Sequence, residues 1–280
     1  MTVLNERTYL APLRRGDLLR RWRGSLIAPA SFVLLILLWE AAIHVFEVPQ
    51  FVVPPPGAVL QALAYGLLPI GSGGGEFWFH IGITMLEAGI GFMIGCLCGI
   101  LLGFVVAHSK TAHTIIYPYM IAFQALPKVA IAPLFIIWFG FGLEAKILMT
   151  ATITFFPLFV NSIAGYHAVD PDRIDMALIC GASRSKIFTK IILPSSMPFI
   201  FAGLNMAAVL ALLGALVAEY VGARYGLGML LITYNTNMQI DGMFALLVIL
   251  AFLGWLFSFI VTLIERRVCF WAQRTKNTAF

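Results

Sequence analysis

The chain of 280 residues is 61% hydrophobic and only 11% charged, whereas soluble domains average roughly 45–50% and about 25%. The mean hydropathy of +0.94 leaves too few polar residues to cover a water-exposed surface. A soluble globular protein, a disordered chain and a coiled coil are therefore excluded. The formal net charge is +5, but the basic residues flank apolar runs instead of forming a solvated face with interleaved aromatic side chains. No nucleic-acid partner is expected.

Six apolar runs with at most one charge each follow one another along the chain. Each reaches or approaches the roughly 20 residues that a helix needs to cross a membrane. A membrane β-barrel would show shorter alternating segments, so we predict an all-α polytopic protein with six transmembrane helices. The first run is too long for the apolar region of a cleaved signal peptide and is interpreted as an uncleaved helix. The runs cover residues 26–46, 81–107, 115–139, 147–165, 199–222 and 243–264.

The distribution of Lys and Arg predicts the orientation of these helices. If the amino terminus is cytoplasmic, fifteen of these residues fall in cytoplasmic segments and two, Lys146 and Arg224, fall on the opposite side. This asymmetry places both termini in the cytoplasm. The predicted organisation is a basic amino-terminal segment, a six-helix membrane domain with a cytoplasmic loop, and a cytoplasmic tail, at residues 1–25, 26–265 (loop 166–198) and 266–280.

Two connections on the outer side differ in character. Residues 47–79 contain the breakers Pro54-Pro55-Pro56-Gly57 and Gly71-Ser72-Gly73-Gly74-Gly75, with room for one short helix between them. Residues 223–242 carry Gly226-Leu227-Gly228 and an apolar stretch too short to cross a membrane. We expect a short interfacial helix there.

Catalytic and metal-binding patterns are missing from the sequence. The five histidines show no ligand spacing with cysteines or carboxylates, and there is no phosphate-binding loop or hydrolase motif. We expect no enzyme activity, no metal and no cofactor in this chain. The four cysteines are expected to be free thiols because two lie in an apolar run and two in basic segments, at Cys96, Cys98, Cys180 and Cys269.

The second run contains glycine at every fourth position. This spacing places Gly91, Gly95, Gly99 and Gly103 on one helix face. A stripe of small residues lets a neighbouring helix approach closely. We predict close helix packing here, with a direct role in lining a path as the alternative.

The third run is interrupted near its middle by Leu126-Pro127-Lys128 and again by Pro133. Broken helices in a membrane occur where the backbone faces protein or a water-filled cavity, and a lysine there needs water or a partner. Lys128 therefore either lines a translocation cavity that favours anions or is the structural partner of a carboxylate or of helix carbonyls. Gln124 is a further candidate for the path.

Polar residues in the later runs complete the set of path candidates. Glu219 lies near the outer end of the fifth run, where we expect its carboxylate to reach interfacial water. It is interpreted either as a cap or inter-helix hydrogen-bonding group, or as a gate or receptor contact. Asn161 and Asn205 either join helices or contact a substrate.

The loop between the fourth and fifth runs begins with the signals of a short helix. Asp170 suits an N-cap and Pro171 the first helical position. Gly181 suits the left-handed residue that ends a helix. These residues predict a helix over residues 171–180.

A second helix is expected to begin at Ser183 and to stop at Pro194. We expect both helices to lie along the inner membrane surface, either as an ordinary amphipathic loop on lipid or as a contact for a partner. The apolar face of the second helix comprises Ile187, Phe188, Ile191 and Ile192.

The same loop resembles the Glu-Ala-Ala loop of binding-protein-dependent ABC importer permeases. Asp175 stands for the usual Glu and Met176 for the first Ala, while Gly181 and Pro194 match at the family spacing. The resemblance implies that this loop contacts an ATPase. The implied coupling residues are Asp175, Met176, Ala177, Gly181, Ala182, Ser183, Ile191, Leu193 and Pro194.

Other motifs resemble the nitrate, sulfonate, taurine and bicarbonate branch of that family, which also includes permeases for pyrimidine precursors and aromatic carboxylates. They are Pro54-Pro55-Pro56, the segment 126–134 running to Trp138-Phe139-Gly140, Glu219, and Gly226-Leu227-Gly228.

The resemblance implies the fold of a type I ABC importer permease in a bacterial inner membrane. It implies as partners a second copy of the permease, two ABC ATPase subunits that bind ATP and Mg, a periplasmic or lipid-anchored substrate-binding protein, and lipid. The implied cargo is a small anionic solute. An ATP-independent channel or secondary transporter is the alternative from another class.

Overall fold

The computed structural model describes residues 15–69 and 75–271, with side chains from residue 29 onward. Within these residues the chain is helical and has no strand, which confirms the all-α class. The helices are α1 (Arg15–Val45), α2 (Pro56–Leu67), α3 (Phe77–His108), α4 (Lys110–Ala125), α5 (Lys128–Phe139), α6 (Leu143–His167), α7 (Pro171–Ile179), α8 (Arg184–Ile187), a π-helical turn (Phe188–Ile192), α9 (Leu193–Gly222), α10 (Leu227–Thr236) and α11 (Ile240–Val268).

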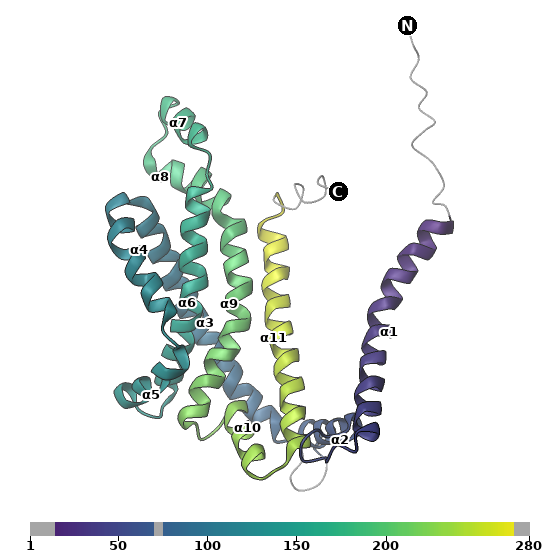
Figure 1. Ribbon diagram of the computed structural model, residues 1–280. Helices are drawn as coiled ribbons and strands as arrows, with labels where there is room; N and C mark the ends of the chain where they lie inside the picture. The colour runs from purple at the N-terminus through teal and green to yellow at the C-terminus, as the bar shows by residue number, and fades with distance from the viewer. Residues whose placement is uncertain (1–14, 70–74, 272–280) are drawn as a thin grey trace.

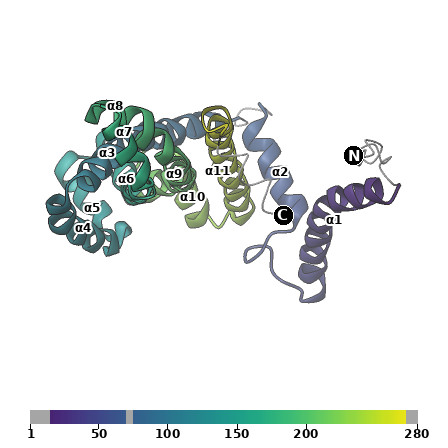
Figure 2. The ribbon, with the colours of Figure 1, turned by 90° about the horizontal axis from the view of Figure 1, so that it is seen from above.

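Helices α3, α6 and α9 form the centre of the molecule. α6 packs along both α3 and α9, and α11 packs on the outer side of α9 (Figure 1). α1 stands apart from this bundle, as the view from above also shows (Figure 2), and touches it near its lower end, where Trp39 lies beside Phe244. These three helices therefore form the centre of the bundle, and α2, α10 and α11 contribute further buried residues beside them.

Glycines allow α3 to lie directly against α6. A Cβ atom at Gly99 would lie 2.5 Å from the carbonyl oxygen of Phe155, and one at Gly103 would lie 2.7 Å from the Cβ atom of Ser162. Real Cβ atoms do not approach so closely, so the backbone contact requires glycine at these positions. The close packing predicted from the four-residue spacing is confirmed.

The third apolar run is not a straight transmembrane helix. α4 ends before Leu126, α5 begins after Pro127, and the two axes differ by 97°. Proline lacks an N–H group and disfavours helical backbone in the preceding residue, which explains the break. The expected interruption at Pro127 is confirmed, whereas Pro133 lies inside α5 and does not end it.

The six expected spans are only partly present. In the described residues, four helical segments are long and apolar enough to cross a membrane, and the bent pair α4–α5 raises the number to five. The described apolar part of α1, Pro29–Val45, is shorter than the others. The basic segment 1–25 and the tail 266–280 lie partly outside the described residues, as does the glycine-rich stretch 70–74.

The connecting helices lie at two opposite ends of the bundle. α2 and α10 occupy one end, where short helices are expected from the sequence, and α7 projects from the other (Figure 1). The start of α1 and the end of α11 lie at the same end as α7. This arrangement places the loop 166–198 and the two ends of the described chain on one side.

Candidate functional site

The projecting helix α7 begins and ends as its local sequence predicts. The side chain of Asp170 accepts a hydrogen bond from the backbone N–H of Asp172 at 3.1 Å, and Pro171 occupies the first turn. At the other end, Gly181 has a φ of +77°. The N–H of Ala182 donates to the carbonyl of Ala177 at 3.0 Å. This hydrogen-bonding pattern with a left-handed glycine is a Schellman motif, which ends the helix sharply.

The second helix of the loop differs from the sequence prediction. Ser183 caps α8 by accepting from the N–H of Lys186, but Pro194 does not stop the helix. The chain continues through the π-helical turn into α9, and Pro194 is the second residue of α9, directly after the turn where the hydrogen-bonding register changes. The loop therefore joins a transmembrane helix directly instead of forming two separate surface helices.

The residues predicted to contact an ATPase, together with their neighbours in this loop, divide into an exposed and a packed group. Ile179 is 87% exposed and Met176 is 64% exposed, so two large apolar side chains of α7 are left uncovered. Ile187 and Ile192 are buried in a cluster that includes Leu158 of α6 and Ile200 of α9. Asp175, Met176, Gly181 and Ser183 are exposed, whereas Ala177, Ala182, Ile191, Leu193 and Pro194 are partly buried.

A groove separates α7 from the start of α9. Its volume is about 440 Å³, and its lining combines the cationic side chains of Arg173 and Lys190 with Met176 and Cys180. α7 is capped at both ends, so it borders this groove as a well-defined helix.

Lys128 lies at the break between α4 and α5. Its ammonium group donates to the carbonyl of Gln124 and lies 5.0 Å from the ring centre of Phe156. Within the described residues no carboxylate pairs with it. Lys128, Gln124 and Phe156 line a cavity of about 280 Å³ that reaches Leu213 and Val217 of α9. The structure thus places both a helix-carbonyl partner and a cavity at this lysine.

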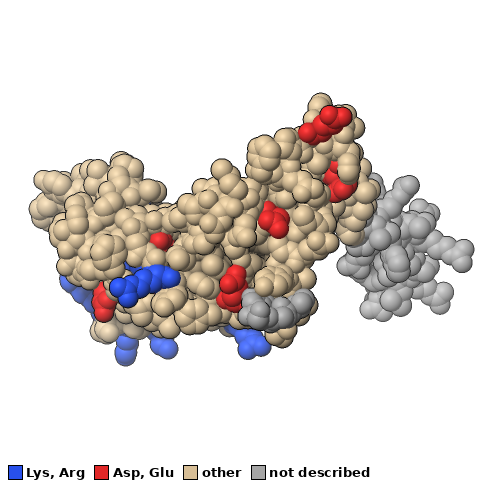
Figure 3. Space-filling model, turned by 90° about the horizontal axis from the view of Figure 1, so that it is seen from below, with Lys and Arg blue, Asp and Glu red and all other residues tan. Residues whose placement is uncertain are grey.

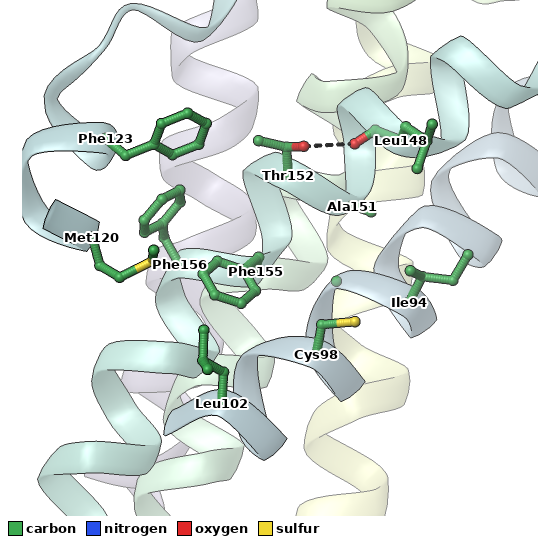
Figure 4. A pocket seen from close by; sticks show the side chains of 11 residues that line it. Ile94, Cys98, Leu102, Met120, Phe123, Leu148, Ala151, Thr152, Phe155 and Phe156 are labelled. Carbon is green, nitrogen blue, oxygen red and sulfur yellow. Dashed lines mark hydrogen bonds between the residues drawn. The ribbon is translucent and has the colours of Figure 1, made fainter. Parts of the chain in front are cut away.

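A second cavity, of about 360 Å³, lies between α3, α4 and α6 (Figure 4). Its lining is apolar, with Cys98, Met120 and Phe155 among the side chains shown. The hydroxyl of Thr152 donates to the carbonyl of Leu148 at 2.8 Å and is not available to a ligand as a donor. This cavity does not suit an anionic solute, because its lining has no cationic side chain and only the weak thiol donor of Cys98.

The two asparagines predicted as path candidates, Asn161 and Asn205, form hydrogen bonds within or between helices. The amide of Asn161 donates to the carbonyl of Pro157 at 2.7 Å, within the same helix. The amide of Asn205 donates to Glu265 at 3.1 Å and accepts from Thr262 at 3.1 Å, which joins α9 to α11. Neither residue lines the cavity at Lys128.

Glu219 is 1% exposed, so the expectation that it reaches interfacial water is wrong. Its carboxyl group accepts from the hydroxyl of Thr84 at 2.7 Å and from the backbone N–H of Gly228 at 2.5 Å. These contacts hold the Gly226-Leu227-Gly228 turn against α3. The turn folds over Glu219 because glycine leaves the carboxyl group room that a Cβ atom would fill.

A buried ion pair beside Glu219 was not recognised from the sequence. The ammonium group of Lys146 donates to Glu87 at 2.7 Å, and both residues are buried. Lys146 therefore lies inside α6 and not in an outer loop as the charge count assumed. The available signal was weak: Glu87 is the one charge in the second run, and Lys146 directly precedes the uncharged fourth run, two runs further along the chain.

The surface at the α2 and α10 end is mostly uncharged, with acidic side chains spread across it and basic side chains gathered toward one edge (Figure 3). Tyr234 of α10 donates a 2.6 Å hydrogen bond to Glu76. Burial and this neighbouring carboxylate raise the pKa of Tyr234 above its usual value. Tyr234 therefore remains a hydrogen-bond donor at physiological pH.

Comparison with known proteins agrees with this architecture. Residues 95–269 match the family described as "Binding-protein-dependent transport system inner membrane component". A probable ABC transporter permease protein of Haemophilus influenzae is 33% identical over 80% of this chain and 89% of its own length. The riboflavin transport system permease protein RibX of Chloroflexus aurantiacus is 33% identical over 87% and 89%. The taurine transport system permease protein TauC of Escherichia coli is 29% identical over 85% and 86%.

The fold is also similar to a solved ABC transporter. A chain of the methionine transporter MetNI, in an inward-facing conformation, aligns with a TM-score of 0.53 and 21% identity. The alignment covers 75% of this chain and 97% of that chain. Putative aliphatic sulfonates permeases SsuC of Bacillus subtilis and Escherichia coli are 30% and 31% identical to this chain, in agreement with the sulfonate and taurine branch. The chain belongs to the family of inner-membrane components of binding-protein-dependent transport systems, as an ABC transporter permease.

Proposed function

We propose that this chain is the transmembrane permease subunit of an ATP-driven importer, which works as a pair around one translocation path for a small anionic solute. The observation that carries the proposal is the α7 loop, a capped helix that projects from the bundle and is anchored in its core. A channel or a secondary transporter has no need for such a loop.

The loop suits the transmission of force from an ATPase. An ATPase subunit would cover the exposed Met176 and Ile179, while ATP and Mg stay in that subunit. Because Ile187 and Ile192 pack against α6 and α9, a displacement of α7 tips these helices together. A packed interior transmits such motion instead of absorbing it.

The cavity at Lys128 supports an anionic cargo. An ammonium group that lies at a helix break, beside a cavity and without a carboxylate partner among the described residues, offers a cation to a passing solute. Phe156 adds an aromatic face to the same cavity. The names of the relatives include sulfonates, taurine, riboflavin and formylaminopyrimidine, so aromatic carboxylates and pyrimidine precursors are the second class of cargo to test.

The orientation proposed is cytoplasmic for α7 and for both termini. A substrate-binding protein then docks at the α2 and α10 end, where the surface is mostly uncharged (Figure 3). Fifteen basic residues fall on the proposed cytoplasmic side, and with the buried Lys146 set aside only Arg224 falls on the other, which supports this orientation.

Reconstitution tests the proposal. The permease, an ABC ATPase that co-purifies with it and a substrate-binding protein are incorporated into proteoliposomes, with ATP inside or outside. Uptake is followed for taurine, an alkyl sulfonate, nitrate, bicarbonate and an aromatic carboxylate. We expect uptake only with hydrolysable ATP on the α7 side and with binding protein on the other side. Uptake that continues without ATP and without binding protein would support a channel and overturn the proposal.

A further inference from the structure

Three ionisable side chains meet in the buried end of the bundle near α10. Glu87 of α3 is 0% exposed, Lys146 of α6 is 7% exposed, and Glu219 of α9 is 1% exposed. Charges removed from water need partners of opposite charge and complete hydrogen bonding. Two acids and one base cannot balance when all three are ionised.

The hydrogen bonds around the two carboxyl groups leave one oxygen atom without a donor. Lys146 donates to Oε1 of Glu87, Thr84 donates to Oε1 of Glu219, and the N–H of Gly228 donates to Oε2 of Glu219. Oε2 of Glu87 is fully buried and receives no hydrogen bond. Thr84 and Glu87 are one turn apart on the same face of α3, and Thr84 bonds to Glu219, so the carboxyl groups of Glu87 and Glu219 are neighbours. An ionised carboxylate only accepts, so two ionised groups in this contact cannot bond to each other.

One proton resolves both the charge and the missing donor. If it lies between Oε2 of Glu87 and the Glu219 carboxyl, the orphan oxygen gains a hydrogen bond. The remaining negative charge is then balanced by Lys146. Shared protons of this kind belong to the pair and not to either residue.

The other charged groups at this end do not replace the proton. On α3, the ring of His80 bonds to the backbone of Gly226, and Glu76 is exposed and bonded to Tyr234. Glu144 of α6 and Arg224 beyond α9 are exposed. Among the described residues, Lys146 is the one cation in an ion pair with either carboxyl group. We propose that Glu87 and Glu219 form a buried proton-binding site that holds a single proton between their carboxyl groups.

This proton site holds the Gly226-Leu227-Gly228 turn in place. Successive backbone N–H groups of the turn donate to His80, to Thr84 and to Glu219, with distances of 2.9 Å from Gly226 and 2.9 Å from Leu227 for the first two. Thr84 and Glu219 are in turn bonded to each other. Loss of the proton would bring two negative charges together, separate α3 from α9, and release the turn from which α10 begins.

Infrared difference spectroscopy of the purified protein in lipid nanodiscs tests the proposal without a transport assay. We expect the wild type at neutral pH to show the carbonyl stretch of a protonated carboxyl group, shifted in D₂O. The band should be missing from Glu87→Gln and from Glu219→Gln, because the single carboxylate that remains is balanced by the charge of Lys146 and needs no proton. The exposed Glu144→Gln is the matched control and should keep the band.

Raising the pH of the wild type gives a second measurement that needs no variant. The band should disappear reversibly on alkalinisation and return at neutral pH. Absence of the band from the wild type at neutral pH would overturn the proposal, even if a variant fails to fold. A band of unchanged intensity in both folded glutamine variants would also overturn it, since the proton would then reside elsewhere.

Discussion

The ammonium group of Lys146 donates a 2.7 Å hydrogen bond to Glu87, and this buried ion pair joins α6 to α3. The two residues are 59 positions apart in the chain. Their contact lies at the end of the bundle where Glu219 holds the Gly226-Leu227-Gly228 turn. The same end therefore depends on charges that belong to three different helices.

Removal of the lysine should destabilise the protein strongly. Lys146→Met leaves buried carboxyl groups without a cation, and breaking one partner of a buried pair costs about 3–5 kcal/mol. Thermal unfolding in detergent should show a clearly lower midpoint than for the exposed control Arg224→Met. Equal midpoints for the two variants would contradict the structural importance of the pair.

The glycine contact between α3 and α6 gives a matched pair of substitutions. Gly99→Ala introduces a Cβ atom 2.5 Å from the carbonyl of Phe155, whereas a Cβ atom at Gly89 meets nothing within 4 Å. We expect Gly99→Ala to lower the free energy of unfolding by about 1–3 kcal/mol through overpacking. Gly89→Ala should be neutral or stabilising by up to about 1 kcal/mol, because alanine favours helix. Chemical unfolding of both variants measures the difference, and a similar loss in both would argue against the close contact.

Lys128 should affect transport more than assembly. Lys128→Met removes the cation from the cavity lined by Gln124 and Phe156, and uptake of an anionic solute should fall at least about tenfold if about 1.4 kcal/mol of attraction is lost. The ATPase should still co-purify with the variant, and Lys128→Arg should retain part of the uptake. Normal uptake by Lys128→Met would leave the contact with the Gln124 carbonyl as the role of this residue.

Two substitutions at Gly181 distinguish the effect of backbone strain from the effect of blocking a partner's contact. Both Gly181→Ala and Gly181→Trp place a side chain at a φ of +77°, with nothing within 4 Å of the new Cβ atom in this chain, and both incur about 1–2 kcal/mol of strain. Only the tryptophan extends into the space that an ATPase would occupy. We expect Gly181→Trp to weaken ATPase co-purification or to uncouple hydrolysis from uptake, with Gly181→Ala close to the wild type. If Gly181→Trp behaves like Gly181→Ala in both assays, this loop is not the coupling element.

Thiol accessibility tests the orientation. Cys180 is exposed at the end of α7, and a cysteine introduced for the exposed Gly57 marks the α2 end. With the other cysteines replaced, an impermeant maleimide should label Gly57→Cys but not Cys180 in intact cells. Inverted membrane vesicles should give the reverse. The opposite result would invert the proposed topology.

The sequence alone was sufficient for features that depend on neighbouring residues. Asp170, Pro171 and Gly181 determine where α7 begins and ends, because caps and left-handed glycines act within a single helical turn. The glycine spacing in α3 predicts its contact face because residues four positions apart lie on the same side of a helix. The apolar runs likewise identify a membrane protein, since each transmembrane helix satisfies its backbone hydrogen bonds within its own segment.

Only the tertiary structure decided which charged groups meet and how the broken helices lie. Glu219 is buried because the turn at Gly226-Leu227-Gly228 folds over it. The 97° bend at Pro127 and the continuation of the helix through Pro194 depend on how α5 and α9 pack. Hydropathy assigns each residue a single transfer preference and contains no information about its partners in the folded chain. The partners of Glu87, Lys146 and Glu219 come from distant positions in the chain. The electrostatic energy of each group depends on its distances to these partners, which only the folded structure supplies.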